Sequence, residues 1–231
     1  MKTIGLLGGM SWESTQLYYR DINLGVRERL GGLHSAKLLL HSVDFAEIER
    51  YQVQGEWQRA GEFLASAAAG LEAAGAELLL ICTNLMHKVA PQIEERIGVP
   101  LLHIADAAGR AIAAQNLKKV GLLGAIYTME ESFYRDRLRE KFDIEVLIPL
   151  RPARELVSRV IFDELCCGEL RPESKAAYLE VIEELAAQGA EGVILGCTEI
   201  PLLIQQQDTD LPLFNTTALH AAYALEESFR A

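Results

Sequence analysis

The sequence lacks the features that mark a membrane protein or a metal-binding domain. It contains no run of about 18 uncharged apolar residues, so we expect no membrane span and no membrane partner. Its four cysteines form no C-x-x-C pair, which argues against a zinc or redox site. Positive charge is scarce, and the net charge of −11 gives no electrostatic reason to bind nucleic acid. These absences favour a small molecule as the partner.

The start of the chain is apolar, but it does not resemble a secretion signal. The apolar stretch is too short, and Trp12 and Glu13 stand where a small-residue cleavage site should lie. We therefore expect a buried first strand there, and a cytoplasmic protein whose thiols stay reduced. With 231 residues, half of them apolar, the chain is long enough for one large domain or two small ones.

Short apolar runs alternate with longer segments of helical spacing, which predicts parallel α/β sheets. The predicted strands are Ile4–Leu7, Lys37–Leu40, Leu78–Ile81, Val120–Leu123, Val146–Ile148 and Val193–Leu195. The clearest predicted helices are Trp57–Ala74 and Pro172–Gln188.

The two halves of the chain repeat one another. Three segments recur in the same order: Thr3–Gly8 as Lys119–Gly124, Gly75–Asn84 as Gly189–Thr198, and Val99–His103 as Leu211–Asn215. One short match could arise by chance, but three in order indicate an internal duplication. We therefore predict two similar α/β domains, related by a pseudo-two-fold axis.

The repeats suggest where the domains divide. We expect the strand after Pro100 to cross into the second half and the strand after Pro212 to cross back. The predicted domains are residues 1–103 plus 213–231, and residues 104–212. Because ligands bind at the carboxyl ends of parallel strands, the polar clusters that follow the two matched strands should face one cleft.

The repeat register places Thr83 opposite Cys197, and Cys82 opposite Gly196. A thiolate is a good proton acceptor, and we expect a helix beginning after Cys197 to lower the pKa of its thiol. Glu199 is close enough in sequence to serve as its general base. The alternative is that Cys197 only fills space at a strand end, but the matching polar cluster at Thr83 and Asn84 favours a catalytic thiol.

Several motifs resemble those of the aspartate/glutamate racemase family, in particular its enterobacterial broad-specificity or L-aspartate/glutamate branch. Leu195–Glu199 looks like the G-C-T-E signature, and Thr83–His87 resembles a first catalytic loop usually read as C-N-T-A-H. Gly8–Ser11 with Thr15, and Gly124–Thr128, resemble two further loops of the family.

The resemblance implies a racemase that uses no cofactor, neither pyridoxal phosphate nor a metal, and works as a homodimer on an amino acid, aspartate or glutamate above all. In the family two thiols face the α-carbon from opposite sides, and the thiol of the second half takes the proton of the L-enantiomer. Here those positions hold Thr83 and Cys197. Hydrogen-bond donors around the carboxylate would stabilise the developing charge, with the Gly8–Met10 turn acting as an anion-binding nest. The implied substrate-binding residues are Met10, Gln52, Thr83, Asn84, Leu85, Thr198 and Glu199.

The chain departs from the family pattern in four places. Thr83 replaces a catalytic cysteine, Leu85 replaces a hydroxyl residue, and Ala125 replaces a threonine. Neither His41–Phe45 nor Ile161–Glu164 carries the basic residue expected in aspartate-selective members. These losses favour an asymmetric or broad-specificity enzyme. A one-thiol decarboxylase or isomerase, or a non-catalytic amino-acid-binding protein, remains an alternative.

Other polar and aromatic residues have simpler interpretations. The expected core or packing residues are Cys82, Trp12, Tyr18 and Tyr19, and the expected structural residues at the domain crossing are His103 and Asp106. Cys166 and Cys167 should end a helix, and His87 either hydrogen-bonds near the first loop or begins a helix.

Overall fold

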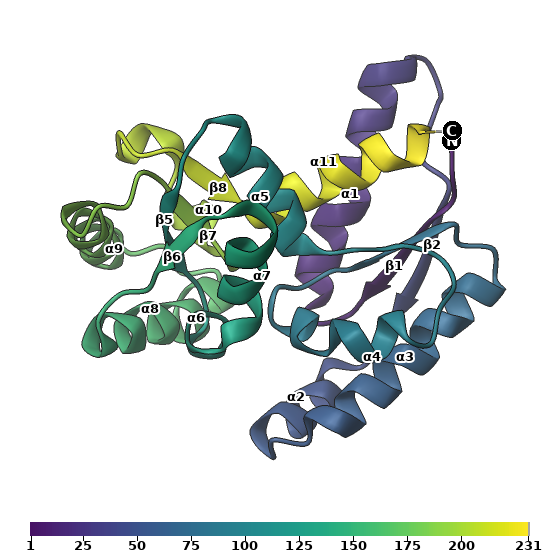
Figure 1. Ribbon diagram of the computed structural model, residues 1–231, viewed down its shortest axis with the longest axis horizontal. Helices are drawn as coiled ribbons and strands as arrows, with labels where there is room; N and C mark the ends of the chain where they lie inside the picture. Colours follow the sequence, from purple (N-terminus) through teal and green to yellow (C-terminus); the bar gives the residue numbers. More distant parts are fainter. Residues whose placement is uncertain (231) are drawn as a thin grey trace. The chain divides into compact units, whose positions relative to one another are not determined.

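The computed structural model describes residues 1–230, and its contacts divide the chain into two units (Figure 1). The first unit consists of Met1–Ile104 and the residues from Thr217 on, and the second is the continuous segment Ala105–Thr216. Each unit has its own four-stranded parallel sheet. The predicted fold class, two similar α/β domains with parallel sheets, is confirmed.

The first sheet has the strand order β2-β1-β3-β4. Its strands are β1 Ile4–Gly8, β2 Leu38–Ser42, β3 Leu78–Ile81 and β4 Leu101–Leu102. The helices of this unit are α1 Trp12–Leu30, α2 Phe45–Val53, α3 Trp57–Ala73, α4 Ala90–Glu94 and α11 Thr216–Phe229, with the 3-10 helix η1 at Leu85–Val89.

Alternation along these strands sends side chains to two apolar layers. Ile4, Leu6, Leu78 and Leu80 pack with residues of α1 and α11, whereas Leu7 and Leu79 pack with α3 on the other face. A sheet covered on both faces explains why its strands read as continuous apolar runs rather than alternating ones.

The second sheet has the equivalent order β6-β5-β7-β8. Its strands are β5 Lys119–Leu123, β6 Glu145–Leu147, β7 Val193–Leu195 and β8 Leu213–Asn215. The surrounding helices are α5 Ile104–Ala114, α6 Ile126–Glu130, α7 Ser132–Phe142, α8 Arg151–Asp163, α9 Pro172–Ala187 and α10 Ile200–Leu203, with η2 at Leu165–Cys167 and η3 at Gln206–Asp208. The packing is close here, since a Cβ on Gly121 would lie 2.8 Å from Cδ1 of Leu185 in α9.

Matched hydrogen bonds in the two sheets bear out the repeat register. Cys82 N–H donates to Leu7 O at 2.9 Å, and Gly196 N–H donates to Leu123 O at 2.7 Å. At the other end of the same strands, Glu77 N–H donates to Thr3 O, and Glu191 N–H donates to Lys119 O. One residue beyond the first pair stand Thr83 and Cys197, which therefore occupy equivalent positions in the two units.

The crossing points differ from the prediction. β4 pairs with β3 in the first sheet and β8 pairs with β7 in the second, so neither strand crosses. Assigning residues 213–215 to the first domain was therefore wrong. Each strand finds backbone partners at once in its own sheet, as Leu79 N–H donates to Pro100 O and Val193 N–H to Pro212 O. The change of unit falls at the helices that follow, α5 and α11.

Within residues 1–230, none of the helices combines the length and the apolar character that crossing a membrane would require. The helix that begins after the first strand, α1, carries both acidic and basic residues.

Candidate active site

The first catalytic loop leaves the sheet at the carboxyl end of β3. Cys82 is fully buried with Leu78 and Leu80, and burial raises the pKa of its thiol. The next residue, Thr83, is half-buried, and Asn84 is buried. The strand alternation thus sends Cys82 into the core, as predicted, and leaves Thr83 as the first residue beyond it.

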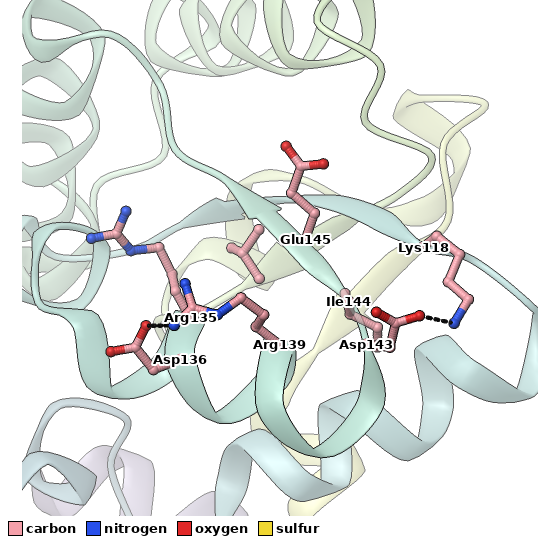
Figure 2. A pocket seen from close by; sticks show the side chains of 8 residues that line it. Lys118, Arg135, Asp136, Arg139, Asp143, Ile144 and Glu145 are labelled. Carbon is pink, nitrogen blue, oxygen red and sulfur yellow. Dashed lines mark hydrogen bonds and ion pairs between the residues drawn. The ribbon is translucent and has the colours of Figure 1, made fainter.

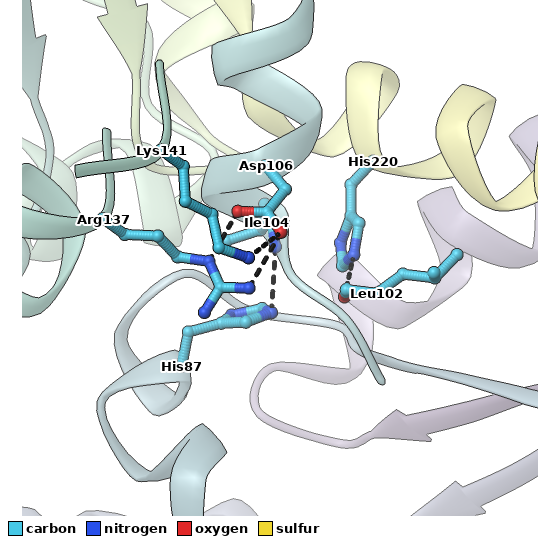
Figure 3. A network of polar contacts seen from close by, with 7 residues as sticks. All are labelled: His87, Leu102, Ile104, Asp106, Arg137, Lys141 and His220. Atoms are coloured by element: carbon cyan, nitrogen blue, oxygen red, sulfur yellow. Dashed lines mark hydrogen bonds and ion pairs between the residues drawn. The ribbon is translucent and has the colours of Figure 1, made fainter. Parts of the chain in front are cut away.

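His87, in the short helix η1, hydrogen-bonds to the backbone of this loop. Its Nδ1 lies 2.8 Å from Thr83 O. Its Nε2 accepts the N–H of Ile104 at 3.2 Å, as Figure 3 shows. The His87 ring is buried and lies 4.5 Å from the ring of His103. The sequence left the role of His87 open, and the structure makes it a hydrogen-bonding partner of the loop.

The Gly8–Ser11 turn follows β1, the strand beside β3. Gly9 has a φ of +91°, and a Cβ there would lie 2.2 Å from Val43 O, so only glycine fits. The N–H of Gly9 donates to Thr15 Oγ1 at 2.9 Å. This donor is therefore committed within the chain, which contradicts its predicted role in an anion-binding nest. Met10 of the same turn is buried.

Gln52, at the end of α2, reaches the first loop through its neighbour Met86. The Gln52 amide Nε2 lies 3.0 Å from Met86 Sδ. Gln52 and Leu85 are both half-buried, and Met86 is fully buried. The first unit thus gathers Gln52 and the Thr83–His87 loop around one region.

The second loop follows β7 in the other unit. Cys197 is a half-buried free thiol, and its Sγ donates to Glu199 Oε2 at 2.9 Å. The hydroxyl of Thr198 donates to the same oxygen at 2.6 Å. Glu199 is thus placed to receive the thiol proton, as the sequence predicted.

The acidity of Cys197 is opposite to the prediction. Burial, then the negative charge of Glu199, raises the pKa of the Cys197 thiol well above its ordinary value. The following helix, α10, has only four residues and starts at Ile200, so it cannot offset these effects. The resting form is a neutral thiol beside a carboxylate.

The surroundings of Cys197 belong to β5, α8 and α9. A Cβ on Gly124 would lie 3.1 Å from Gly196 O, so the Gly124 loop packs against the backbone beside Cys197. Ser158 Oγ accepts the N–H of Ile126 at 3.2 Å and holds that loop. Burial raises the pKa of Tyr178, and ionisation of Cys197 would raise it further. The Tyr178 hydroxyl donates to Val157 O. No sequence pattern identified Tyr178 as a neighbour of the thiol.

The remaining predictions have mixed outcomes. Cys166 and Cys167 end η2 before Gly168, as predicted, and both are exposed. Tyr18 is buried, but Trp12 and Tyr19 are 63% and 57% exposed, so their predicted packing is wrong. On the first helix Trp12 and Tyr19 are seven residues apart and share its outer face.

Asp106 is structural, as predicted. Its carboxylate accepts hydrogen bonds from Arg137 at 2.5 and 2.8 Å and from Lys141 at 3.0 Å (Figure 3). Burial by itself would raise the pKa of Asp106, but the hydrogen bonds and charges of the two cations outweigh it and lower this pKa.

A surface hollow of about 570 Å³ lies elsewhere in the second unit (Figure 2). Lys118, Arg135 and Arg139 line it together with Asp136, Asp143 and Glu145. The hollow sits by α7 and the amino ends of β5 and β6, whereas Cys197 follows the carboxyl end of β7. Its opposite charges balance, so it does not favour an anionic substrate.

Comparison with known proteins places the chain in a family. The model described as Asp/Glu/Hydantoin racemase matches residues 7–224. A glutamate racemase of Pseudomonas aeruginosa is 27% identical over 203 residues, which are 84% of this chain and 72% of that protein. The chain belongs to the Asp/Glu/Hydantoin racemase family.

Solved structures agree over the full length of the chain. A crystal structure of a candidate Asp/Glu racemase from Yersinia pestis has 54% sequence identity and a TM-score of 0.96, with 100% of each chain covered. An aspartate racemase homologue from Pyrococcus horikoshii OT3 has 35% identity and a TM-score of 0.89, also over 100% of each chain.

Proposed function

We propose that this protein is a cofactor-independent amino-acid racemase that acts on aspartate or glutamate at the α-carbon. The observation that carries the proposal is the Cys197 thiol, which stands at the position equivalent to Thr83 and donates a hydrogen bond to Glu199. Family membership, a glutamate racemase among its relatives and a structural neighbour described as an aspartate racemase homologue support the reaction class.

The proposed cycle begins with two proton transfers. The Glu199 carboxylate takes the thiol proton of Cys197, and the resulting thiolate removes the α-proton of the L-substrate. The substrate then carries the electron pair of the broken C–H bond as a carbanion, delocalised into its carboxylate. Donors around that carboxylate, with Asn84 and Thr198 as candidates, stabilise the charge.

Thr83 completes the inversion in this proposal. Its hydroxyl donates a proton to the opposite face of the α-carbon and regains one from solvent. The protonated Glu199 gives its proton back to solvent, so that Cys197 and Glu199 return to their starting state. Because a hydroxyl gives up a proton far less readily than a thiol, the transfer from Thr83 is slow. We therefore propose that Cys197 often returns a proton to the same face after its own proton has exchanged with solvent, so that L-substrate exchanges its α-hydrogen without inversion. In this proposal the Thr83 hydroxyl and the Cys197 thiol act on one substrate molecule. Met10, Gln52, Leu85 and Glu199 are further candidates for contact with that substrate.

The test uses L-aspartate, with L-glutamate in parallel, in deuterated buffer. The wild type should incorporate deuterium at the α-position, and Cys197→Ser should slow this by about 10³-fold or more, because a hydroxyl is a much weaker acid than a thiol. Cys167→Ala, at an exposed position, is the matched control and should exchange normally. Near-normal exchange in Cys197→Ser would rule out the mechanism.

Thr83→Cys tests the other half of the proposal. A thiol at this position should raise inversion and also exchange from the D-enantiomer, because it can both donate and accept the proton. Equal exchange from D- and L-aspartate in the wild type would exclude the one-sided mechanism. Release of carbon dioxide from a substituted malonate would instead favour the one-thiol decarboxylase. That alternative is considered because Thr83 stands where a second thiol is expected.

A further inference from the structure

We infer that His87 is a positioning residue for the Thr83 side of the reaction, an inference that rests on the proposed function. His87 lies four residues after Thr83 and bonds to its carbonyl oxygen, not to its hydroxyl. It therefore acts on the proposed proton donor through the backbone.

The two backbone partners of His87 determine its tautomer. A carbonyl oxygen only accepts, so Nδ1 must carry a hydrogen to bond Thr83 O at 2.8 Å. A backbone N–H only donates, so Nε2 must be bare to accept Ile104 N–H at 3.2 Å. One neutral tautomer satisfies both bonds, and the ring is buried to 1% exposure, which holds it in place.

This bond orients a whole peptide unit of the loop. A trans peptide is planar, and its C=O and N–H point in opposite directions. With Thr83 O turned toward His87, the N–H of Asn84 points away from His87. His87 therefore orients the peptide unit that joins Thr83 to Asn84, directly next to the Thr83 side chain.

The other ring nitrogen of His87, Nε2, is hydrogen-bonded to the backbone of Ile104 in the first unit. Ile104 is fully buried and is the last residue before the chain enters the second unit. His220 occupies a neighbouring position, with its ring 5.5 Å from that of His87 (Figure 3). Its Nε2 donates to Leu102 O at 2.7 Å and its Nδ1 accepts from Tyr18, so it holds the opposite tautomer.

His220 thus provides a matched control. It is as buried as His87 and belongs to the same group of rings, and it hydrogen-bonds to Leu102 O of β4 and to Tyr18 of α1. Loss of either ring should weaken the core, whereas loss of His87 also removes the hydrogen bond to Thr83 O.

Two substitutions, His87→Asn and His87→Gln, each keep one of the two hydrogen bonds of His87 and remove the other. Asparagine places an amide N–H near the position of Nδ1 and keeps a donor for Thr83 O. Glutamine reaches the position of Nε2 and keeps an acceptor for Ile104 N–H, but it loses the bond to Thr83.

The measurement is the ratio of D-aspartate formed to L-aspartate deuterated, starting from L-aspartate in deuterated buffer. Formation of D-aspartate needs the Thr83 side, and labelling of L-aspartate needs only Cys197. We expect the ratio to fall about tenfold or more in His87→Gln and His87→Ala, and to stay within about threefold of wild type in His87→Asn, because a small misplacement of a reacting group is costly. His220→Ala should leave the ratio unchanged even if its stability falls.

Nitrogen NMR of the wild-type imidazoles gives a readout that is independent of activity. We expect the hydrogen on Nδ1 of His87 and on Nε2 of His220. The opposite tautomer at His87, or a ratio that is equal in all His87 variants and in wild type, overturns the positioning role. Should His87→Ala fail to fold, the Asn and Gln pair decides. A wild type that neither labels nor inverts L-aspartate or L-glutamate would instead overturn the proposed function itself.

Discussion

At the scale of single residues, the protonation state of Cys197 is the main departure from the sequence-based expectation. A thiol that follows a strand and precedes a helix is expected to be acidic, yet burial and the neighbouring Glu199 carboxylate raise its pKa. The base in the proposed reaction is therefore the pair of Cys197 and Glu199. The thiol proton can pass directly to Glu199 along this hydrogen bond, whose Sγ and Oε2 atoms lie 2.9 Å apart.

Glu199→Gln should separate the two parts of this pair. The substitution removes the negative charge, so the pKa of Cys197 should fall toward its ordinary value while burial keeps it raised. Alkylation of Cys197 by iodoacetamide, followed by mass spectrometry of its peptide, should begin at lower pH than in wild type. The exposed Cys167 serves as the internal reference. An unchanged or higher alkylation pH would show that Glu199 does not act on the thiol.

The same variant makes a prediction for the pH dependence of exchange. A thiolate beside a protonated Glu199 has the same number of protons as a thiol beside a carboxylate. In wild type the fraction of protein in the thiolate form is therefore independent of pH around neutrality. In Glu199→Gln the thiol must lose its proton to solvent, and exchange should rise about tenfold per pH unit below the thiol pKa. A flat profile in the variant would contradict this assignment.

At the scale of elements, the turns after β1, β3 and β7 carry all the candidate residues except Gln52, which lies on α2. Backbone geometry decides what each turn can do. The β1–α1 turn requires Gly9, because of its positive φ and the 2.2 Å approach of a Cβ to Val43 O. The bond from Gly9 N–H to Thr15 Oγ1 then ties the turn to the first helix.

Gly9→Ala and Gly31→Ala form a matched pair at the two ends of α1. Both glycines have a positive φ, but a Cβ on Gly31 meets nothing within 4 Å. We expect Gly31→Ala to cost about 1–3 kcal/mol in free energy of unfolding from the backbone conformation alone, because a φ of 73° with a ψ of −175° is a region that essentially only glycine adopts. Gly9→Ala should cost clearly more, since the clash adds to the same strain. Urea denaturation of both variants measures the difference, and equal losses would refute the steric argument.

The Asp106 contact between α5 and α7 should make stability depend on acid pH. Its folded pKa is depressed, so the stabilisation is present above the unfolded pKa of about 3.9 and is lost as pH falls through the folded pKa. Asp106→Asn should cost about 1–3 kcal/mol at pH 7, as expected for hydrogen bonds to charged groups. Urea midpoints measured from pH 7 to pH 2 should converge for the two proteins at the acid end. Parallel curves would show that Asp106 contributes no charge-dependent stability.

At the scale of the whole molecule, the chain is two copies of one strand order, each ending in an equivalent polar loop. The copies have diverged where the chemistry would lie, with a hydroxyl at Thr83 in one and a thiol at Cys197 in the other. This difference is the basis for proposing a racemase in which proton transfer by Cys197 is faster than proton transfer by Thr83 on the opposite face of the substrate.

The proposed reaction predicts that the protein needs no added cofactor. Exhaustive dialysis against a chelator should leave α-proton exchange unchanged, because the proposed proton transfers use only side chains of this chain. Loss of exchange on dialysis, with recovery on adding pyridoxal phosphate or a divalent metal, would contradict the proposal. A dialysed sample assayed without chelator distinguishes metal loss from other damage.

Much of the fold followed from local pattern, because apolar runs and repeats are local properties of the chain. The predicted runs at Leu78–Ile81 and Val193–Leu195 are strands with those same limits, and the register of Thr83 with Cys197 agrees with the matched hydrogen bonds. The burial of Cys82 also followed from strand alternation.

The tertiary structure decided what depends on residues distant in sequence. The place where the chain changes unit, the exposure of Trp12, the link from Thr83 through His87 to Ile104, and the raised pKa of Cys197 all arise from packing between separate elements. Local pattern predicts which residues form a strand and which loop follows it. Desolvation, charge and hydrogen bonding depend on what packs around a side chain, and only the folded chain determines that.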